Sequence, residues 1–165
     1  MTGYFRDPSN TADGLQDGWV HTGDLASLDE DGNLYFHGRL KNVIKRAGEN
    51  IAGEELETVI MEHPAVEQCL VTGVPDPIYT EEVYAAIVVR EGMSISETEV
   101  GDWCAGHLSK WKIPRYVHLQ DEPFPALQNG KIDRVAALGR VDASTSWDRP
   151  REGSEALDKS AGGRP

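Results

Sequence analysis

The chain has 165 residues, of which 28 are acidic and 16 are basic, and its formal net charge is −12. This length suits one domain with a proper core, or one domain joined to part of another. The acidic excess argues against a general binder of nucleic acids or anionic membranes, because such binding relies on Lys and Arg to neutralise phosphate. A local basic pocket is compatible with it, and residues 39–46 form a basic cluster.

The cysteines and the hydropathy pattern indicate the cellular compartment in which the protein is expected. Cys69 and Cys104 are the only cysteines, and two thiols so far apart in sequence favour free core residues over a disulfide. No apolar run is long enough to span a bilayer, and no signal peptide is recognisable. We therefore expect a cytoplasmic protein without a membrane span.

The first forty residues predict turns and one hairpin. Residues 1–18 are rich in turn formers, and apolar patterning begins at Trp19. The acidic segment at residues 29–33 starts with D-x-D-G, as a calcium loop does, but its later positions do not follow the EF-hand spacing. A turn between two short strands, the second over residues 34–37, is the better interpretation.

Residues 42–138 alternate between predicted strands and helices. Short apolar runs indicate the strands, and apolar residues three or four positions apart indicate the helices. A capping-box pattern from Ser96 to Glu99 marks one helix start, and prolines mark helix ends. In chain order we expect a hairpin over 42–50, a helix over 53–62, strands over 66–74 and 83–90, a helix from 96, a strand over 116–119 and a short helix over 132–138.

The helix that begins at Ser96 carries apolar residues at intervals of three and four: Val100, Trp103, Cys104, Leu108 and Trp111. This spacing favours tryptophans that pack in the core over tryptophans that form a platform for a cofactor. Beyond Arg140 the sequence turns to Ser, Gly, Pro and mixed charge, which predicts a disordered tail over residues 141–165.

Common motifs of a self-contained ATPase, dehydrogenase, hydrolase or metalloenzyme are missing from the sequence. Ile132 follows the lysine of NGKI where a Walker A loop needs Ser or Thr, and no G-x-G-x-x-G or G-x-S-x-G string occurs. Asp24 in its T-G-D turn and Arg39 could still serve a nucleotide, since a carboxylate accepts ribose hydroxyls and a guanidinium donates to ribose or phosphate. By itself, however, an Asp in such a turn is more often a turn former.

Three longer strings occur in order: GWVHTGD at residues 18–24, GRLKNVIKRAGENI at 38–51 and NGKIDR at 129–134. Together they resemble the adenylate-forming (AMP-binding) enzymes, which include acyl- and aryl-CoA ligases, firefly luciferase and the adenylation domains of peptide synthetases. The resemblance runs from about Gly3 to Leu138. The wording IKRAGENIAGEELE is closer to the acyl-CoA ligases, with a loose likeness to carnitine- and medium-chain-acyl-CoA ligases and hence to fatty acid metabolism.

The resemblance implies a role for each matching residue. Lys131 would be the adenylation lysine, which offsets negative charge as the carboxylate attacks the nucleotide. Without the resemblance, Lys131 would count as an exposed turn lysine, and the other lysines as solvated surface charges. The remaining roles are Asp24 and Arg39 on the nucleotide, Lys41 at the hinge, Lys45 on the segment that enters the site after the domain turns, and Ala47, Gly48 and Glu49 on CoA.

The resemblance also implies an α+β fold in which an antiparallel sheet packs with helices. Residues 1–40 would be the tail end of the large N-terminal domain, as a β-hairpin remnant, and residues 41–140 the mobile C-terminal domain. The expected partner is an N-terminal adenylation domain that carries the phosphate loop, the acyl pocket and the magnesium site. Trp19, Leu25, Leu34 and Phe36 would then pack on that domain, so we expect residues 1–40 to expose apolar surface.

On this resemblance the chain is the C-terminal part of an ATP-dependent acyl-CoA synthetase and is not active alone. The reaction would join a carboxylic acid to CoA through an acyl-adenylate and release AMP and pyrophosphate. The alternative is a catalytically silent module, or one that acts in trans. Three positions depart from the family: Ala47 and Thr80 stand where glycine is common, and Gly53 stands where a proline usually starts the helix.

Overall fold

A six-stranded sheet is the centre of the fold in the computed structural model, which describes residues 1–150. Its strands run in the order β10-β9-β8-β5-β6, and β7 pairs with β8. Every pair is antiparallel except β8 with β9. The strands are β5 (Val43–Arg46), β6 (Glu49–Ala52), β7 (Val66–Asp76), β8 (Thr80–Val89), β9 (Tyr116–Gln120) and β10 (Trp147–Asp148).

The parallel β8–β9 pair corrects the expectation of a purely antiparallel sheet. The chain between these strands passes through helix α3 (Glu97–His107) and a short 3₁₀ turn (Lys110–Lys112). Parallel neighbours require such a crossover, because the chain must return to the starting end of the sheet before the second strand begins. The sheet is therefore mixed, and the α+β class is confirmed.

Both faces of the sheet are covered. On one face α2 (Gly53–Met61) and α3 enclose the larger core, which includes Leu56, Val71 and Ile87. On the other face Leu70 and Phe124 belong to a second core with the short helix α4 (Arg134–Leu138). Alternate residues of a strand point to opposite faces, which explains why β7 and β8 read as nearly continuous apolar runs.

Helix α3 begins where its capping box predicts. The Ser96 hydroxyl accepts from the Glu99 backbone N–H at 3.3 Å, and the Glu99 carboxylate accepts from the Ser96 N–H at 2.8 Å. Trp103 is half-buried and donates its indole N–H to the Val59 carbonyl of α2 at 2.9 Å. Trp111 lies beyond the end of α3 and is 36% exposed, so its predicted core position is wrong.

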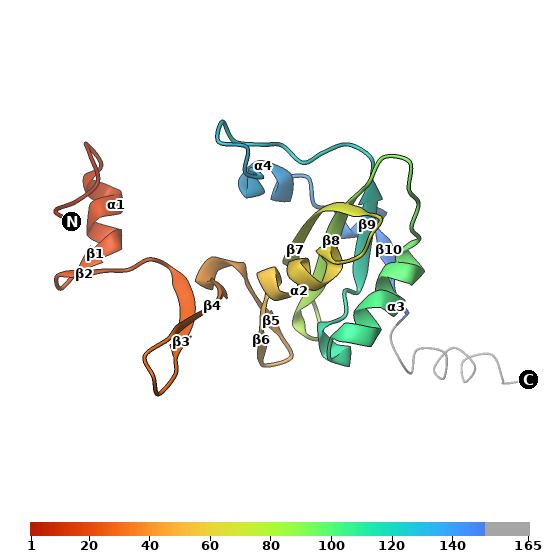
Figure 1. Cartoon of the computed structure of the whole chain (residues 1–165), viewed down its shortest axis with the longest axis horizontal. Coiled ribbons are helices and arrows are strands. Elements are labelled where there is room, and N and C mark those ends of the chain that lie inside the picture. Colours follow the sequence, from red (N-terminus) through yellow and green to blue (C-terminus); the bar gives the residue numbers. More distant parts are fainter. Residues whose placement is uncertain (151–165) are drawn as a thin grey trace, which may run out of the picture.

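The first forty residues extend away from residues 41–150, which we call the body, and form two small sheets of their own (Figure 1). Strand β3 (Asp24–Leu28) pairs with β4 (Leu34–Arg39) across the acidic turn. Asp29 accepts backbone N–H groups of Asp31 and Asn33 at 3.0 and 2.8 Å, so the hairpin-turn interpretation is confirmed. Upstream lie α1 (Pro8–Gly14), β1 (Leu15–Gln16) and β2 (Trp19–Val20).

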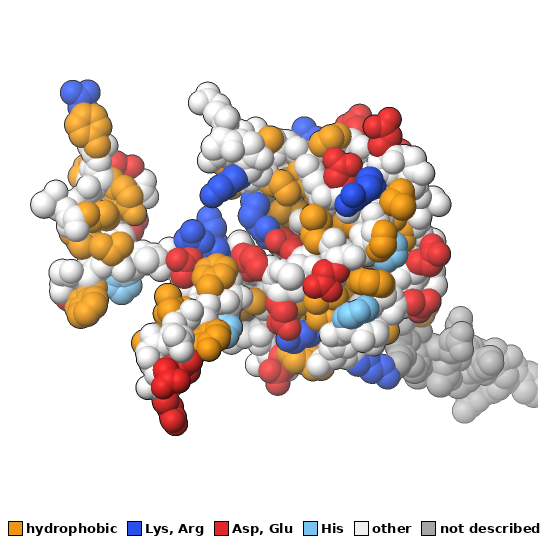
Figure 2. Space-filling view, viewed as in Figure 1, with side chains coloured by type: hydrophobic (Ala, Val, Ile, Leu, Met, Phe, Trp, Pro, Cys, Tyr) orange, Lys and Arg blue, Asp and Glu red, His pale blue; other side chains and the backbone are white. Residues whose placement is uncertain are grey.

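Large apolar side chains are exposed along this N-terminal segment, as expected from the sequence. Trp19 is 77% exposed and Leu34 is 70% exposed, and Leu25, Leu28 and Phe36 are exposed as well. Figure 2 shows the apolar side chains on the outside of the segment, next to the acidic turn of the β3–β4 hairpin.

Residues 141–150 correct the predicted start of the disordered tail. Trp147 packs on the larger core and Val141 on the smaller one. Strand β10 pairs with β9, and Asp148 forms an ion pair with Arg115 at 2.6 Å. A few apolar residues within a polar stretch are thus enough to attach it to the sheet. The rest of the predicted tail, residues 151–165, lies outside the described residues. Within residues 1–150 no helix is long and apolar enough to cross a membrane.

Candidate functional site

Asp24 and Arg39, the two expected nucleotide-binding residues, lie side by side. They are directly opposite each other in the β3–β4 hairpin, and the Arg39 Nε lies 2.9 Å from the Asp24 Oδ1. Arg39 also donates to the Thr22 carbonyl at 2.8 Å. Gly23 turns the chain with a φ of +73°, a conformation that favours glycine. The side chains of Asp24 and Arg39 are 29% and 50% exposed, so a ligand can reach both.

The junction between the hairpin and the body holds the expected hinge residue. Lys41 is exposed and lies in a single 3₁₀ turn (Leu40–Asn42) between β4 and β5. Asn42 donates its amide to the Glu54 carboxylate at the start of α2. Gly38 lies against the same carboxylate, because a Cβ there would be 2.7 Å from the Glu54 Oε2. Glu54 therefore contacts both sides of the junction.

The β5–β6 hairpin presents the residues expected to act on CoA. Ala47 and Gly48 form its two-residue turn with φ values of +52° and +86°. Two positive φ values are typical of the turn that best suits a twisted hairpin, which explains why glycine would fit position 47 better than alanine. The Lys45 side chain is exposed, and its backbone N–H donates to the Glu81 carboxylate at 2.6 Å.

Lys131 lies on a separate, narrow loop before α4. The Leu127 N–H donates to the Lys131 carbonyl at 2.8 Å, and Gly130 has a φ of +80°. Asn129 accepts the Lys131 N–H at 3.1 Å. These bonds close a tight turn and leave the Lys131 side chain exposed.

The structure thus brings together Asp24 and Arg39 but keeps apart Lys131 and Lys45, the two lysines expected to act in catalysis. Figure 1 shows the loop of Lys131 at one end of the body and the tip of the β5–β6 hairpin at the opposite end. One orientation of this body therefore presents Lys131 to a given point, and a different orientation presents Lys45.

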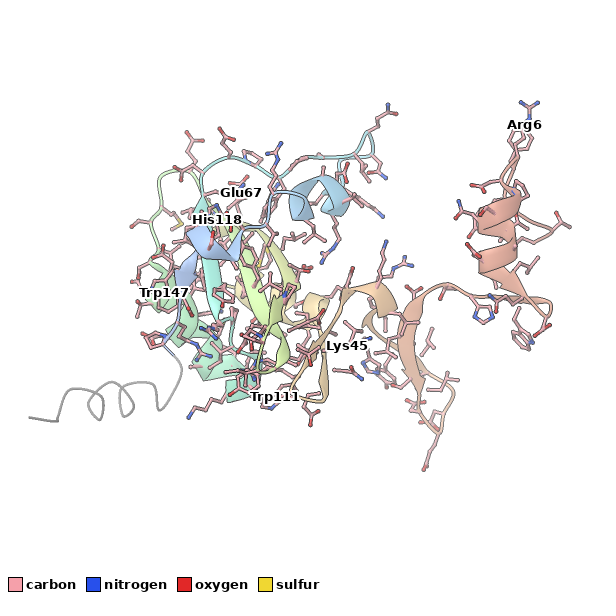
Figure 3. The ribbon with its side chains drawn as sticks, turned by 180° about the vertical axis from the view of Figure 1, so that it is seen from behind. Arg6, Lys45, Glu67, Trp111, His118 and Trp147 are labelled. Carbon is pink, nitrogen blue, oxygen red and sulfur yellow. The ribbon has the colours of Figure 1, made fainter. Side chains whose placement is uncertain are left out.

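A cavity of about 470 Å³, which was not predicted from the sequence, lies beside the β5–β6 hairpin. The Arg46 guanidinium lies 4.6 Å from the centre of the Tyr79 ring. It also donates to both carboxylate oxygens of the buried Glu82, at 2.7 and 3.0 Å. Figure 3 places Lys45 and Trp111 at this same end of the body. The lining residues are Arg46, Tyr79, Glu82, Lys110, Trp111, Arg115, Arg149 and Pro150.

Four basic and one acidic side chain line this cavity, and Arg46 and Arg115 among the basic ones form ion pairs with carboxylates. Arg115 donates to both oxygens of Asp148 at 2.6 and 2.8 Å. This hydrogen bonding raises the pKa of Arg115 above its ordinary value, so the guanidinium remains charged. No local sequence pattern marks this cavity, because its lining residues come from segments far apart in the chain.

Neither cysteine suits nucleophilic chemistry. Cys69 and Cys104 are free and buried, as predicted. Burial raises the pKa of Cys69 well above its ordinary value, and that of Cys104 to about 11. Both thiols therefore stay protonated at neutral pH. Within residues 1–150 no three His, Cys, Asp or Glu side chains are grouped so that they could hold a metal ion.

Comparison with known families shows which family the body of the chain matches. Residues 55–131 match the family described as the AMP-binding enzyme C-terminal domain. The chain therefore contains an AMP-binding enzyme C-terminal domain, and the relatives it matches are acid–thiol ligases. It is 42% identical over 132 residues to the crotonobetaine/carnitine–CoA ligase of Escherichia coli O8, strain IAI1, and 39% identical over 132 residues to the oxalate–CoA ligase of Arabidopsis thaliana. These matches cover 79% and 80% of this chain, but 25% and 26% of the relatives.

Solved structures agree with this assignment. The o-succinylbenzoate CoA synthetase MenE of Bacillus subtilis, in complex with the acyl-adenylate OSB-AMP, superposes with a TM-score of 0.76 at 32% identity, over 86% of this chain and 28% of that one. ATP-bound MatB of Rhodopseudomonas palustris gives 0.71 at 33% identity, over 83% and 27%. The amide bond synthetase McbA of Marinactinospora thermotolerans gives 0.74 at 37% identity, over 86% and 29%. The chain thus spans about a quarter of the length of its relatives.

Proposed function

We propose that these residues supply the mobile C-terminal part of an ATP-dependent acyl-CoA ligase. The observation that carries the proposal is the separation of Lys131 from the β5–β6 hairpin on a body of the AMP-binding C-terminal family. A two-step reaction, first adenylation and then thioester formation, can use one such end for each step. A large adenylation domain would provide the phosphate loop, the acyl pocket and the magnesium site, and residues 1–40 would complete its edge.

In the adenylation step, the Asp24 carboxylate would accept the ribose hydroxyls of the nucleotide. Arg39, which lies 2.9 Å from Asp24, would keep that carboxylate oriented and donate to the ribose or phosphate. Lys131 would bring its ammonium to the α-phosphate and the attacking carboxylate. There it would offset the charge that develops as pyrophosphate leaves.

In the thioester step, the body would turn about Lys41 and present the β5–β6 hairpin. The backbone at Ala47 and Gly48 carries little side-chain bulk, so an extended thiol can pass close to it. The cavity beside the turn combines cations with the Tyr79 and Trp111 rings. Cations suit the phosphates of CoA, and aromatic rings suit its adenine. Its volume of about 470 Å³ is that of an ordinary ligand pocket.

The exposed apolar side chains of residues 1–40 are an argument for the presence of a partner domain. Trp19, Leu34 and Phe36 would be covered by the adenylation domain, and burial of a large apolar side chain contributes about 1.5–3 kcal/mol. The same surface would serve the alternative function, a silent or in-trans module, so activity measurements must separate the two.

The test is carboxylate-dependent ATP–pyrophosphate exchange. The 165-residue chain is assayed alone and after mixing with the part of the E. coli crotonobetaine/carnitine–CoA ligase that precedes the matched segment, with carnitine as the carboxylate. We expect no exchange from the chain alone and exchange from the mixture. Strong exchange by the 165 residues alone would contradict the proposed division of the site, and a silent mixture would favour the non-catalytic module.

A further inference from the structure

The loop that carries Lys131 continues directly into α4, whose first residue is Arg134. The Asp133 N–H donates to the Pro125 carbonyl at 2.7 Å, and Ile132 packs on the smaller core. The two residues that follow Lys131 therefore fix one end of the loop. Arg134 comes directly after these two residues, so the contacts of its side chain help to determine where Lys131 lies.

Arg134 forms a fork that joins α4 to α2 and β7. Its Nη1 donates to the Glu57 Oε1 at 2.7 Å, and its Nη2 donates to the Val71 carbonyl at 3.1 Å. The same Glu57 oxygen accepts the Val71 N–H at 2.8 Å. Glu57 and Arg134 thus satisfy both backbone polar groups of Val71, and their side chains are only 16% and 27% exposed.

These two side chains provide the hydrogen bonds that a neighbouring strand would otherwise make with β7 at the edge of the sheet. Buried backbone N–H and C=O groups need partners, and here two charged side chains from different helices supply them. A guanidinium donates in a rigid planar fork, so its two bonds fix orientation as well as distance. Arg134, and with it the loop three residues earlier, is therefore held in one geometry relative to β7.

The same helix also reaches the junction with the N-terminal hairpin. Glu54 lies three residues before Glu57, and residues at this spacing share a helix face. Glu54 accepts the amide of Asn42, next to Lys41. Helix α2 therefore links the expected hinge to the loop of Lys131.

We propose that Glu57 and Arg134 are positioning residues for Lys131, which hold its loop at a fixed place on the body so that rotation at the hinge delivers the ammonium to the nucleotide. This inference rests on the proposed adenylation role of Lys131. The two residues do not themselves contact the substrate, so their loss should affect the adenylation step far more than the thioester step.

The kinetic test compares the two half-reactions in the mixture with the adenylation domain. Arg134→Gln should lower the kcat of pyrophosphate exchange about ten- to hundred-fold, the size expected for a misplaced catalytic group, and leave the KM for ATP within about two-fold. Thioester formation from supplied acyl-adenylate should stay within about two-fold of the parent. Glu57→Gln, which keeps an acceptor oxygen, should give a smaller loss, and Arg134→Lys should recover part of the rate. Arg140→Gln, a change at an exposed arginine, is the matched control.

Hydrogen exchange on the 165-residue chain gives a readout that does not depend on activity. Arg134→Gln should speed the exchange of the Val71, Leu127 and Asp133 amides about ten-fold or more, and should leave the Ile87 amide in β8 unchanged. Unaltered exchange at all three amides, or equal losses in both half-reactions, would overturn the positioning role. If the parent mixture forms no adenylate, the proposed function fails, while the exchange data still decide whether this pair holds the loop.

Discussion

At the scale of single residues, Arg46 is the charge partner of the buried Glu82 in the wall of the cavity. The sequence pointed to Asp24, Arg39 and Lys131 through the resemblance of their strings to the adenylate-forming enzymes, and their roles stay predictions. The cavity could not be predicted, because residues far apart in sequence, such as Arg46, Glu82 and Trp111, converge only after the sheet has formed. The most costly arrangement in that wall is the buried Glu82, which is 1% exposed and depends on Arg46 for its charge partner.

Replacing Arg46 by Met should therefore destabilise the body. Removal of one partner of a buried ion pair leaves an uncompensated charge and costs about 3–5 kcal/mol. We expect a loss of about 3 kcal/mol in the free energy of unfolding, measured by urea denaturation. The double variant Arg46→Met with Glu82→Leu should recover more than half of this loss, and additive losses would contradict the pairing.

A substitution at Thr80 should raise the free energy of unfolding instead of lowering it. It has a φ of +71° although its side chain is branched at Cβ, and a left-handed conformation costs an L-residue about 1–2 kcal/mol. The flexibility of glycine in the unfolded chain offsets about 0.5–1 kcal/mol of this gain. Thr80→Gly should therefore raise the free energy of unfolding by about 0.5–1 kcal/mol, measured by urea denaturation.

The reverse kind of substitution, from glycine to a residue with a side chain, should lower the free energy of unfolding at another turn. Gly48 has a φ of +86° with open space around it, so Gly48→Ala introduces backbone strain without a steric clash. It should lower the free energy of unfolding by about 1 kcal/mol. Stabilisation by Gly48→Ala would contradict the turn geometry.

At the scale of elements, periodicity predicted the strands and helices with enough apolar residues to show a pattern. Helix α3 is the clearest example, because the capping box at Ser96 fixes its start. The sequence did not predict the parallel β8–β9 pair, the short helix α1, the β1–β2 pair or strand β10. Pairing direction depends on the crossover through α3. Strand β10 has only two residues, and its attachment through Trp147 and through the Asp148–Arg115 ion pair appears only in the folded chain.

The corrected C-terminal boundary can be tested at Trp147. Trp147→Ala should lower the free energy of unfolding by about 2 kcal/mol, less than the 3–5 kcal/mol typical of a fully buried tryptophan because this ring is only partly buried. The measurement is urea denaturation, with Val135→Ala as control, because Val135 is 81% exposed. A change below about 0.5 kcal/mol for Trp147→Ala would mean that β10 contributes little to the fold.

At the scale of the whole molecule, the chain consists of a well-packed body and an extended N-terminal segment. The body buries two cores on opposite faces of one sheet, whereas residues 1–36 expose most of their large apolar side chains. The likeness to a longer family predicted this contrast, since Trp19 and Leu34 were expected to pack on a further domain. Rotation of the body between two orientations belongs to the proposed function and would require the proposed adenylation domain.

The contrast in packing predicts a contrast in hydrogen exchange for the 165-residue chain. Backbone amides over residues 11–36 should exchange orders of magnitude faster than those over residues 83–89 in β8, because few buried contacts oppose local opening. Addition of the adenylation domain should slow exchange in the first range and leave the second unchanged. Equal protection of both ranges in the isolated chain would contradict an unpartnered segment.

In the proposed function the two ends of the body serve different half-reactions, and a pair of variants can separate them. Pyrophosphate exchange and thioester formation from supplied acyl-adenylate are measured for Lys131→Ala and Lys45→Ala in the mixture with the adenylation domain. We predict that Lys131→Ala abolishes exchange and spares thioester formation, whereas Lys45→Ala chiefly slows thioester formation. If each variant instead lowers both rates by the same factor, the two ends do not divide the reaction between them.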